Sequence, residues 1–121
     1  MSGERFQSFE TFWPFYLGEH SLPATRWFHF VGSCLALLTV GSAIVMMQPL
    51  YALGALFWGY GFAWVSHFFI EKNRPATFTY PLWSFIGDWK MWAFMLTGKL
   101  DAELKRLNIT PKVAGASQPS V

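Results

Sequence analysis

The chain has 121 residues, of which 53% are hydrophobic, 20% aromatic and only 13% charged, whereas soluble domains carry about 25% charged residues. The net charge of +2 comes from scattered Lys and Arg, which excludes a nucleic-acid binder with a basic stripe. A single cysteine, Cys34, excludes an intramolecular disulfide.

The first predicted element is an amphipathic helix over residues 4–18. Bulky aromatic side chains recur there at three- and four-residue steps, and the charged residues lie off that stripe. The pattern predicts an N-terminal interfacial aromatic helix, which lies in the membrane surface rather than spanning it. Pro14 is expected to kink the helix and Gly18 to end it. The stripe consists of Phe6, Phe9, Phe12, Trp13 and Tyr16.

The next element is built from the 44 residues of 27–70, which contain no Asp, Glu, Lys or Arg. Gln48 and Pro49 divide them into two apolar runs of about 20 residues, the length with which a helix crosses about 30 Å of hydrocarbon. We therefore predict a transmembrane hairpin with helices at about 22–47 and 50–71. Ser21 is the expected N-cap of the first helix, with Pro23 in its first turn.

His29 and His67 lie one on each arm of this hairpin, equally far in sequence from Gln48. On antiparallel helices of equal rise, residues equidistant from the turn lie at equal depth, here about 28 Å of helix from it. Two imidazoles at one depth on neighbouring helices form a candidate site. The alternative is that both histidines seek the membrane surface and extend toward lipid headgroups.

The distribution of cations predicts the orientation of the hairpin. The turn at 47–50 carries no charge, whereas the other end is flanked by cations. The positive-inside rule then places the N-terminus, the 71–80 loop and the histidine ends in the cytoplasm. The expected location is integral and multi-pass, in a bacterial inner membrane or the ER membrane. The nearest cations are Arg5, Arg26, Lys72 and Arg74.

A third apolar helix is predicted at about 80–97, although Asp88 and Lys90 stand in its middle. Ser84 and Asp88 are four residues apart, so both can face inward. This helix either dips into the cytoplasmic leaflet or crosses the membrane beside the N-terminal helix. A short polar helix follows at 101–108. The expected fold is thus an all-α membrane helical bundle, with residues 1–108 as one domain and 109–121 as a disordered polar tail.

All three histidines of the chain are predicted to gather at the cytoplasmic boundary, together with several carboxylates. Imidazole is the commonest protein ligand for iron, zinc and copper, and histidines with carboxylates are typical of non-haem Fe(II) oxygen chemistry. From the residues alone, a metal site, a proton-linked or headgroup-binding site and structural ion pairs all remain open. The polar set is Glu19, His20, His29, His67, Glu71, Asn73, Arg74 and Asp88.

Three stretches of the chain resemble the small integral-membrane family typified by the fungal 2-hydroxy fatty acid dioxygenase. They are residues 12–20 (FWPFYLGEH), 26–32 (RWFHFVG) and 67–78 (HFFIEKNRPATF), followed by Pro81, Ser84, Gly87 and Asp88. The resemblance covers about residues 8–95. It implies an Fe(II)-dependent dioxygenase of fatty acid α-oxidation, which uses O2 to shorten a 2-hydroxy fatty acid by one carbon without 2-oxoglutarate or haem.

The resemblance places the family's histidines at His20, His29 and His67, with Glu19, Glu71 and Asn73 at the accompanying motif positions. The hypothesis of an oxygenase extends from these positions to the further residues named below. The expected Fe(II) ligands are His20, His29 and His67. The expected catalytic residues, which complete or orient the ligand set, are Glu19, Glu71 and Asp88. The expected substrate-binding residues are Arg26, Asn73 and Arg74, because a guanidinium can bind a carboxylate through two parallel hydrogen bonds. The expected partners are a 2-hydroxy fatty acid, O2 and membrane lipids, and a homo-oligomer stays open.

Two other classes of function compete with the oxygenase. In one, His29 and His67 are the axial ligands of a haem held between the two helices, which would leave His20 without a role. In the other, the chain is a non-catalytic lipid-binding membrane protein whose polar cluster recognises headgroups.

Overall fold

The computed structural model describes residues 5–110, which are helical throughout apart from short connections. This confirms the predicted all-α class for the described part of the chain. The predicted tail at 109–121 lies outside the described residues from position 111 onward. The helices are α1 (Phe9–Gly18), α2 (Pro23–Val45), α3 (Leu53–Val65), α4 (Pro81–Leu96) and α5 (Leu100–Arg106). Shorter elements are the 3₁₀ turns Pro49–Ala52 and Ala76–Phe78 and the π-helical segment Ser66–Glu71.

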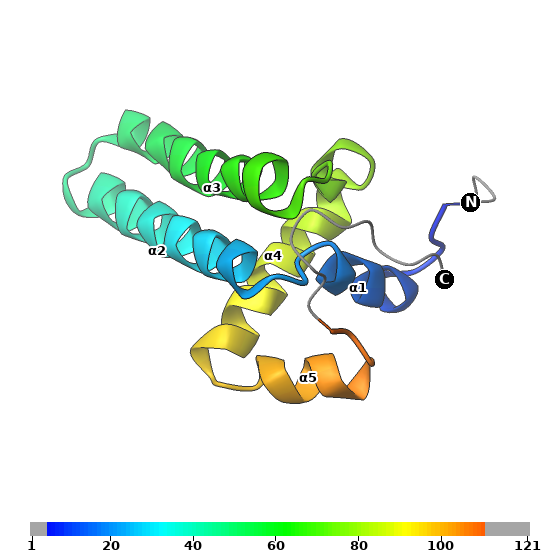
Figure 1. Cartoon of the computed structure of the whole chain (residues 1–121). Coiled ribbons are helices and arrows are strands. Elements are labelled where there is room, and N and C mark those ends of the chain that lie inside the picture. Colours follow the sequence, from blue (N-terminus) through cyan, green and yellow to red (C-terminus); the bar gives the residue numbers. More distant parts are fainter. Residues whose placement is uncertain (1–4, 111–121) are drawn as a thin grey trace.

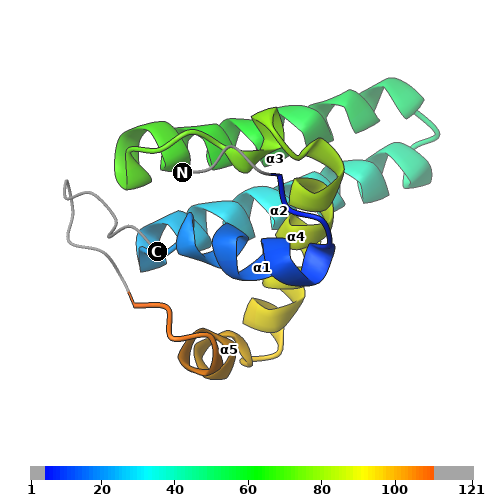
Figure 2. The ribbon, with the colours of Figure 1, turned by 90° about the vertical axis from the view of Figure 1, so that its right-hand side faces the viewer.

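Helices α2 and α3 form an antiparallel hairpin that projects away from the other helices (Figures 1 and 2). Segments Pro23–Val45 and Pro49–Glu71 are long and apolar enough to cross a membrane by length and composition, close to the predicted 22–47 and 50–71. Only 22% and 17% of their most apolar windows are buried within the protein. Most of this apolar surface therefore faces outward, as at Ile44 and Val45, which are 71% and 84% exposed.

The two arms approach each other closely at Gly32, one turn beyond His29. A Cβ atom at this position would lie 2.7 Å from the Phe62 Cβ and 2.9 Å from the Trp58 carbonyl oxygen. Small residues of this kind let helix backbones approach closely in membrane bundles. Gly32 thus sets the spacing between α2 and α3 at the end of the hairpin that carries the histidines.

We expect Gly32→Ala to lower the free energy of unfolding by about 1–3 kcal/mol, because the added methyl group overpacks a tight contact. Gly41→Ala is the matched control: it lies in the same helix, and a Cβ there meets no heavy atom within 4 Å. The control should be neutral or slightly stabilising, since alanine favours helix by about 1 kcal/mol over glycine. Unfolding of the detergent-solubilised protein measures both, and equal midpoints for the two variants would show that the contact does not determine stability.

The aromatic stripe of the N-terminal helix contacts protein rather than the membrane surface. Helix α1 begins at Phe9, where Ser8 Oγ accepts a hydrogen bond from the Thr11 N–H, and ends at Gly18 as predicted. Phe12, Trp13 and Tyr16 are at most 3% exposed. They pack in a core with residues of α4 and α5, so the lipid-facing role expected for this stripe is wrong. An aromatic stripe has the same sequence pattern whether it packs against lipid or against other helices.

Helix α4 matches the third predicted helix at 80–97 and turns Ser84 and Met91 inward, at 3% and 1% exposure. Its contact with α1 depends on Gly87, because a Cβ there would lie 3.1 Å from the Tyr16 ring. This close approach places the Tyr16 hydroxyl against Asp88. Whether α4 enters the membrane stays a prediction.

Candidate metal centre

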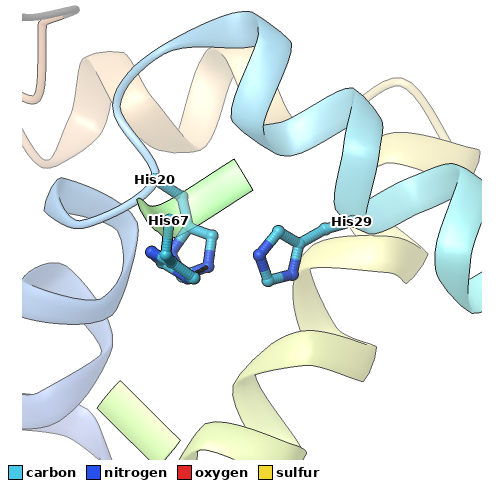
Figure 3. Close-up of side chains that lie close together, drawn as sticks. All are labelled: His20, His29 and His67. Atoms are coloured by element: carbon cyan, nitrogen blue, oxygen red, sulfur yellow. Dashed lines mark hydrogen bonds between the residues drawn. The ribbon is translucent and has the colours of Figure 1, made fainter. Parts of the chain in front are cut away.

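The structure brings the three histidines together at the end of the hairpin opposite its turn. His20 follows α1, His29 belongs to α2 and His67 to the π-helical segment (Figure 3). Their exposed fractions are 1%, 6% and 2%. The ring centroids of His29 and His67 are 5.1 Å apart, as expected from their equal distance to the turn, and His20 lies 4.4 Å and 4.5 Å from them. One nitrogen from each ring falls within 4.8 Å of the other two.

The tautomer of His20 follows from its backbone partner. Its Nδ1 lies 2.7 Å from the carbonyl oxygen of Tyr16, one helical turn earlier. A carbonyl can only accept, so Nδ1 carries the hydrogen and Nε2 keeps its lone pair. Burial, together with the neighbouring His29 and His67, lowers the pKa of His20 well below its ordinary value. The ring is therefore neutral at pH 7 and able to coordinate a metal.

The tautomer of His67 is determined in the same way by Asn73. The Asn73 amide nitrogen donates to the Glu19 carbonyl at 3.0 Å, so its oxygen faces the His67 Nδ1 at 2.7 Å and accepts that hydrogen. The lone pair of His67 Nε2 then points at that of His20 Nε2, 3.0 Å away. Two acceptors at this separation repel unless a cation lies with them. Such partners on the far nitrogen are typical of metal-binding histidines.

His29 supplies a third nitrogen to the same space. Its Nε2 is buried and has no hydrogen-bond partner within the described part of the chain. Leaving such an atom unpaired costs about 1–3 kcal/mol. A divalent metal would satisfy this atom and also relieve the repulsion between His20 and His67. Three neutral imidazoles suit iron, zinc or copper, so the donor set fits a metal of this class.

Asp88 is the carboxylate closest to this group in the ion pairs observed. Its Oδ1 lies 3.8 Å from the His29 Nδ1, which is an ion-pair distance rather than a hydrogen bond. The Tyr16 hydroxyl donates to the same carboxylate. Burial raises the pKa of Asp88 to about 7, against the lowering effect of the Tyr16 hydrogen bond. Among the described residues the tight metal-type group contains the three histidines alone.

The Glu71 carboxylate contacts the start of α2 rather than joining the histidine group. Its Oε2 accepts a hydrogen bond of 2.6 Å from the Leu22 N–H, and Leu22 is the N-cap residue. The expectation that Ser21 caps α2 is therefore wrong. A carboxylate from the other arm satisfies a free N–H where the helix dipole is positive. Glu71 thereby ties the segment that carries His67 to the first turn of α2.

The expected substrate residues occupy three different settings. Arg26 is 8% exposed and donates through Nη1 to the carbonyls of His20 and Ser21, at 2.9 and 2.8 Å. Two backbone carbonyls of the 19–22 connection thus hold the Arg26 guanidinium inside the protein. Asn73 contacts His67 and the carbonyl of the half-buried Glu19. Arg74 is exposed, 5.1 Å from the Phe78 ring centroid.

A haem between His29 and His67 does not agree with this geometry. His20 Nε2 lies 3.0 Å from His67 Nε2, and the His20 and His29 ring centroids are 4.4 Å apart. The macrocycle would have to occupy the space that the His20 imidazole already fills.

The fold and the site together define a class: a helical protein with an apolar hairpin long enough to cross a membrane and a three-histidine, metal-type centre at one end. The chain belongs to the Mpo1-like family. The family model, described as 2-hydroxy-palmitic acid dioxygenase Mpo1-like, matches residues 6–100, which contain every candidate site residue. This confirms the family that the sequence resembles. No curated protein and no solved structure matches the chain.

Proposed function

We propose that this protein is an Fe(II)-dependent membrane dioxygenase that shortens 2-hydroxy fatty acids by one carbon. The observation that supports it most is the group of three buried imidazoles within 4.8 Å of one another. The description of the family supplies the substrate class and the use of O2. Among the metals that imidazole binds, zinc has no redox chemistry, and we choose iron over copper because iron is the metal that the family resemblance implies.

In this proposal His20, His29 and His67 would hold the metal, and Fe(II), when bound, would supply the one-electron chemistry that O2 requires. The Tyr16 carbonyl and the Asn73 amide keep the lone pairs of His20 and His67 directed inward. The expected catalytic residues act on the ligands from outside. Asp88 lies beside His29, the Glu71 carboxylate positions the His67 segment, and the backbone carbonyl of Glu19 anchors Asn73.

The overall reaction balances with one O2 per substrate. The bond between C1 and C2 breaks, C1 leaves as CO2, C2 becomes the new carboxyl group, and one water is released. We assign to the exposed Arg74 the role of attracting the substrate carboxylate from the aqueous side, while Arg26 holds the connection that carries His20.

We place the hairpin across the membrane with the histidine end in the cytoplasm, as the positive-inside rule indicates. Arg5, Lys72 and Arg74 lie in sequence on that side of the hairpin, and its turn is uncharged. A centre near the headgroups suits an amphiphile whose polar head reaches the imidazoles while its tail stays in hydrocarbon.

Metal analysis combined with one turnover experiment tests this function. The purified protein is loaded with Fe(II), incubated anaerobically with 2-hydroxyhexadecanoic acid, exposed to O2 and followed by mass spectrometry. We expect pentadecanoic acid, no product without O2, and no product with Zn(II) in place of Fe(II). A Soret band in the purified protein would favour the haem alternative. Absence of bound metal together with unchanged substrate would favour a non-catalytic lipid-binding protein.

A further inference from the structure

A cavity of about 210 Å³ extends from the candidate metal centre along the hairpin, between α2, α3 and α4. His29 and Asp88 line one end of it. Beyond them the lining is largely apolar and includes Ala36, Val40 and Leu56. The cavity therefore has one polar end, at the imidazoles, and an apolar remainder.

The cavity follows one face of α2. His29, Ala36 and Val40 are seven and four residues apart, which places them on the same side of a helix. From His29 to Val40 the helix rises about 16 Å at about 1.5 Å per residue. This is close to half of the roughly 30 Å hydrocarbon core, the depth that one acyl chain covers.

Gly59 creates part of this space on α3. A Cβ at Gly59 would meet no heavy atom within 4 Å, unlike at Gly32, where the arms touch. The cavity is smaller than the roughly 300–1,000 Å³ of enclosed ligand pockets, so an extended ligand in it keeps one side against lipid. An amphiphile with a polar head and a single tail matches these features.

We propose that this cavity binds the acyl chain of the 2-hydroxy fatty acid, and that Gly59 determines the chain length the protein accepts. The head lies toward His29 and the tail runs toward Val40 and Leu56. This inference rests on the proposed function, because it takes the substrate class from there. In this orientation the C1–C2 bond of the fatty acid lies near the imidazoles.

A photo-crosslinking experiment tests the location without turnover. The probe is 2-hydroxyhexadecanoic acid with a diazirine at carbon 10, added to the full-length protein in lipid nanodiscs under anaerobic conditions. We expect labelled peptides from the faces of α2 and α3 that carry Val40 and Leu56, and competition by unlabelled 2-hydroxyhexadecanoic acid. Labelling of the outward residues Leu38 and Ile44 without competition would overturn the proposal, and would indicate nonspecific partition into the surrounding lipid.

A pair of glycine variants tests the chain-length role. Gly59→Leu fills the cavity, whereas Gly61→Leu adds the same side chain to the same helix outside the residues that line it; a Cβ at either glycine meets no heavy atom within 4 Å. We expect Gly59→Leu to raise KM for 2-hydroxyhexadecanoic acid about tenfold or more. The KM for 2-hydroxyoctanoic acid and the iron content of the protein should stay unchanged. Gly61→Leu should change none of these quantities. Ala36→Leu, from the opposite wall, replaces Gly59→Leu if that variant does not fold.

The outcomes separate the two proposals. Competed labelling inside the cavity without any turnover removes the proposed function and leaves the binding site. Turnover of the substrate combined with labelling outside the cavity supports the proposed function and overturns the binding site. An equal effect of Gly59→Leu on the long and the short acid would overturn the role of Gly59.

Discussion

Replacing His67 with alanine is expected to abolish both iron binding and turnover. His67 supplies one of three buried nitrogens that lie within 4.8 Å of one another. Removing a partner that only orients a metal ligand already lowers affinity about 10–100-fold, so loss of a ligand itself should exceed that range. Elemental analysis after equilibration with buffered Fe(II), followed by the turnover assay on the same sample, measures both quantities.

Thermal stability gives an independent readout for the same variant. A ligand that binds only the folded state stabilises it by RT ln(1 + [L]/Kd), about 2.7 kcal/mol at a hundredfold excess over Kd. Fe(II) should therefore raise the Tm of the wild-type protein and leave that of His67→Ala unchanged. Iron at wild-type stoichiometry in the variant would remove His67 from the ligand set, whatever the effect on activity.

The hairpin and the pairing of its histidines could be predicted because both depend on features visible in the sequence. The length of the uncharged stretch indicates the length of the helices. Because the two helices are antiparallel, residues equally far from Gln48 lie at equal depth. His29 and His67 accordingly lie with ring centroids 5.1 Å apart. His20 was included because the connection after residue 18 returns to the same end of the bundle, where it completes the group.

The setting of α1 could not be predicted, since an aromatic stripe shows which face is apolar and not what covers it. The stripe predicts that Tyr16 lies at the membrane surface, yet its ring packs on α4, its hydroxyl reaches Asp88 and its carbonyl orients His20. The spacing of four residues between Tyr16 and His20 was the available signal. A carbonyl is present at every position, however, so spacing alone does not indicate that one is used.

The roles of Glu71 and Arg26 were also beyond sequence reasoning, for a related reason. Each binds backbone groups of the 19–22 connection: Glu71 accepts from the Leu22 N–H, and Arg26 donates to the carbonyls of His20 and Ser21. Which backbone groups lack partners depends on how the chain turns between α1 and α2. The path of that turn depends on tertiary packing, and no motif in the sequence predicts it.

The second large effect is expected at Asn73, because its contact with the candidate metal centre is the hydrogen bond to His67. Its side-chain oxygen accepts from His67 Nδ1 at 2.7 Å, and its nitrogen donates to the Glu19 carbonyl at 3.0 Å. We expect Asn73→Leu, which keeps the volume and removes the acceptor, to weaken Fe(II) binding about 10–100-fold. Gln48→Ala, the loss of an exposed amide in the turn at the other end of the hairpin, should leave affinity unchanged.

The conservative variant Asn73→Asp distinguishes orientation of the ligand from general stability. Aspartate still accepts the hydrogen of His67 Nδ1 but cannot donate to the Glu19 carbonyl. If Asn73 works by keeping the lone pair of His67 directed at the metal, Asn73→Asp retains most of the Fe(II) affinity. The Tm of this variant measures the cost of the lost Glu19 contact separately. If Asn73 serves only to hold the 71–80 loop, the aspartate and leucine variants should lose affinity alike, and titration with Fe(II) decides between the two.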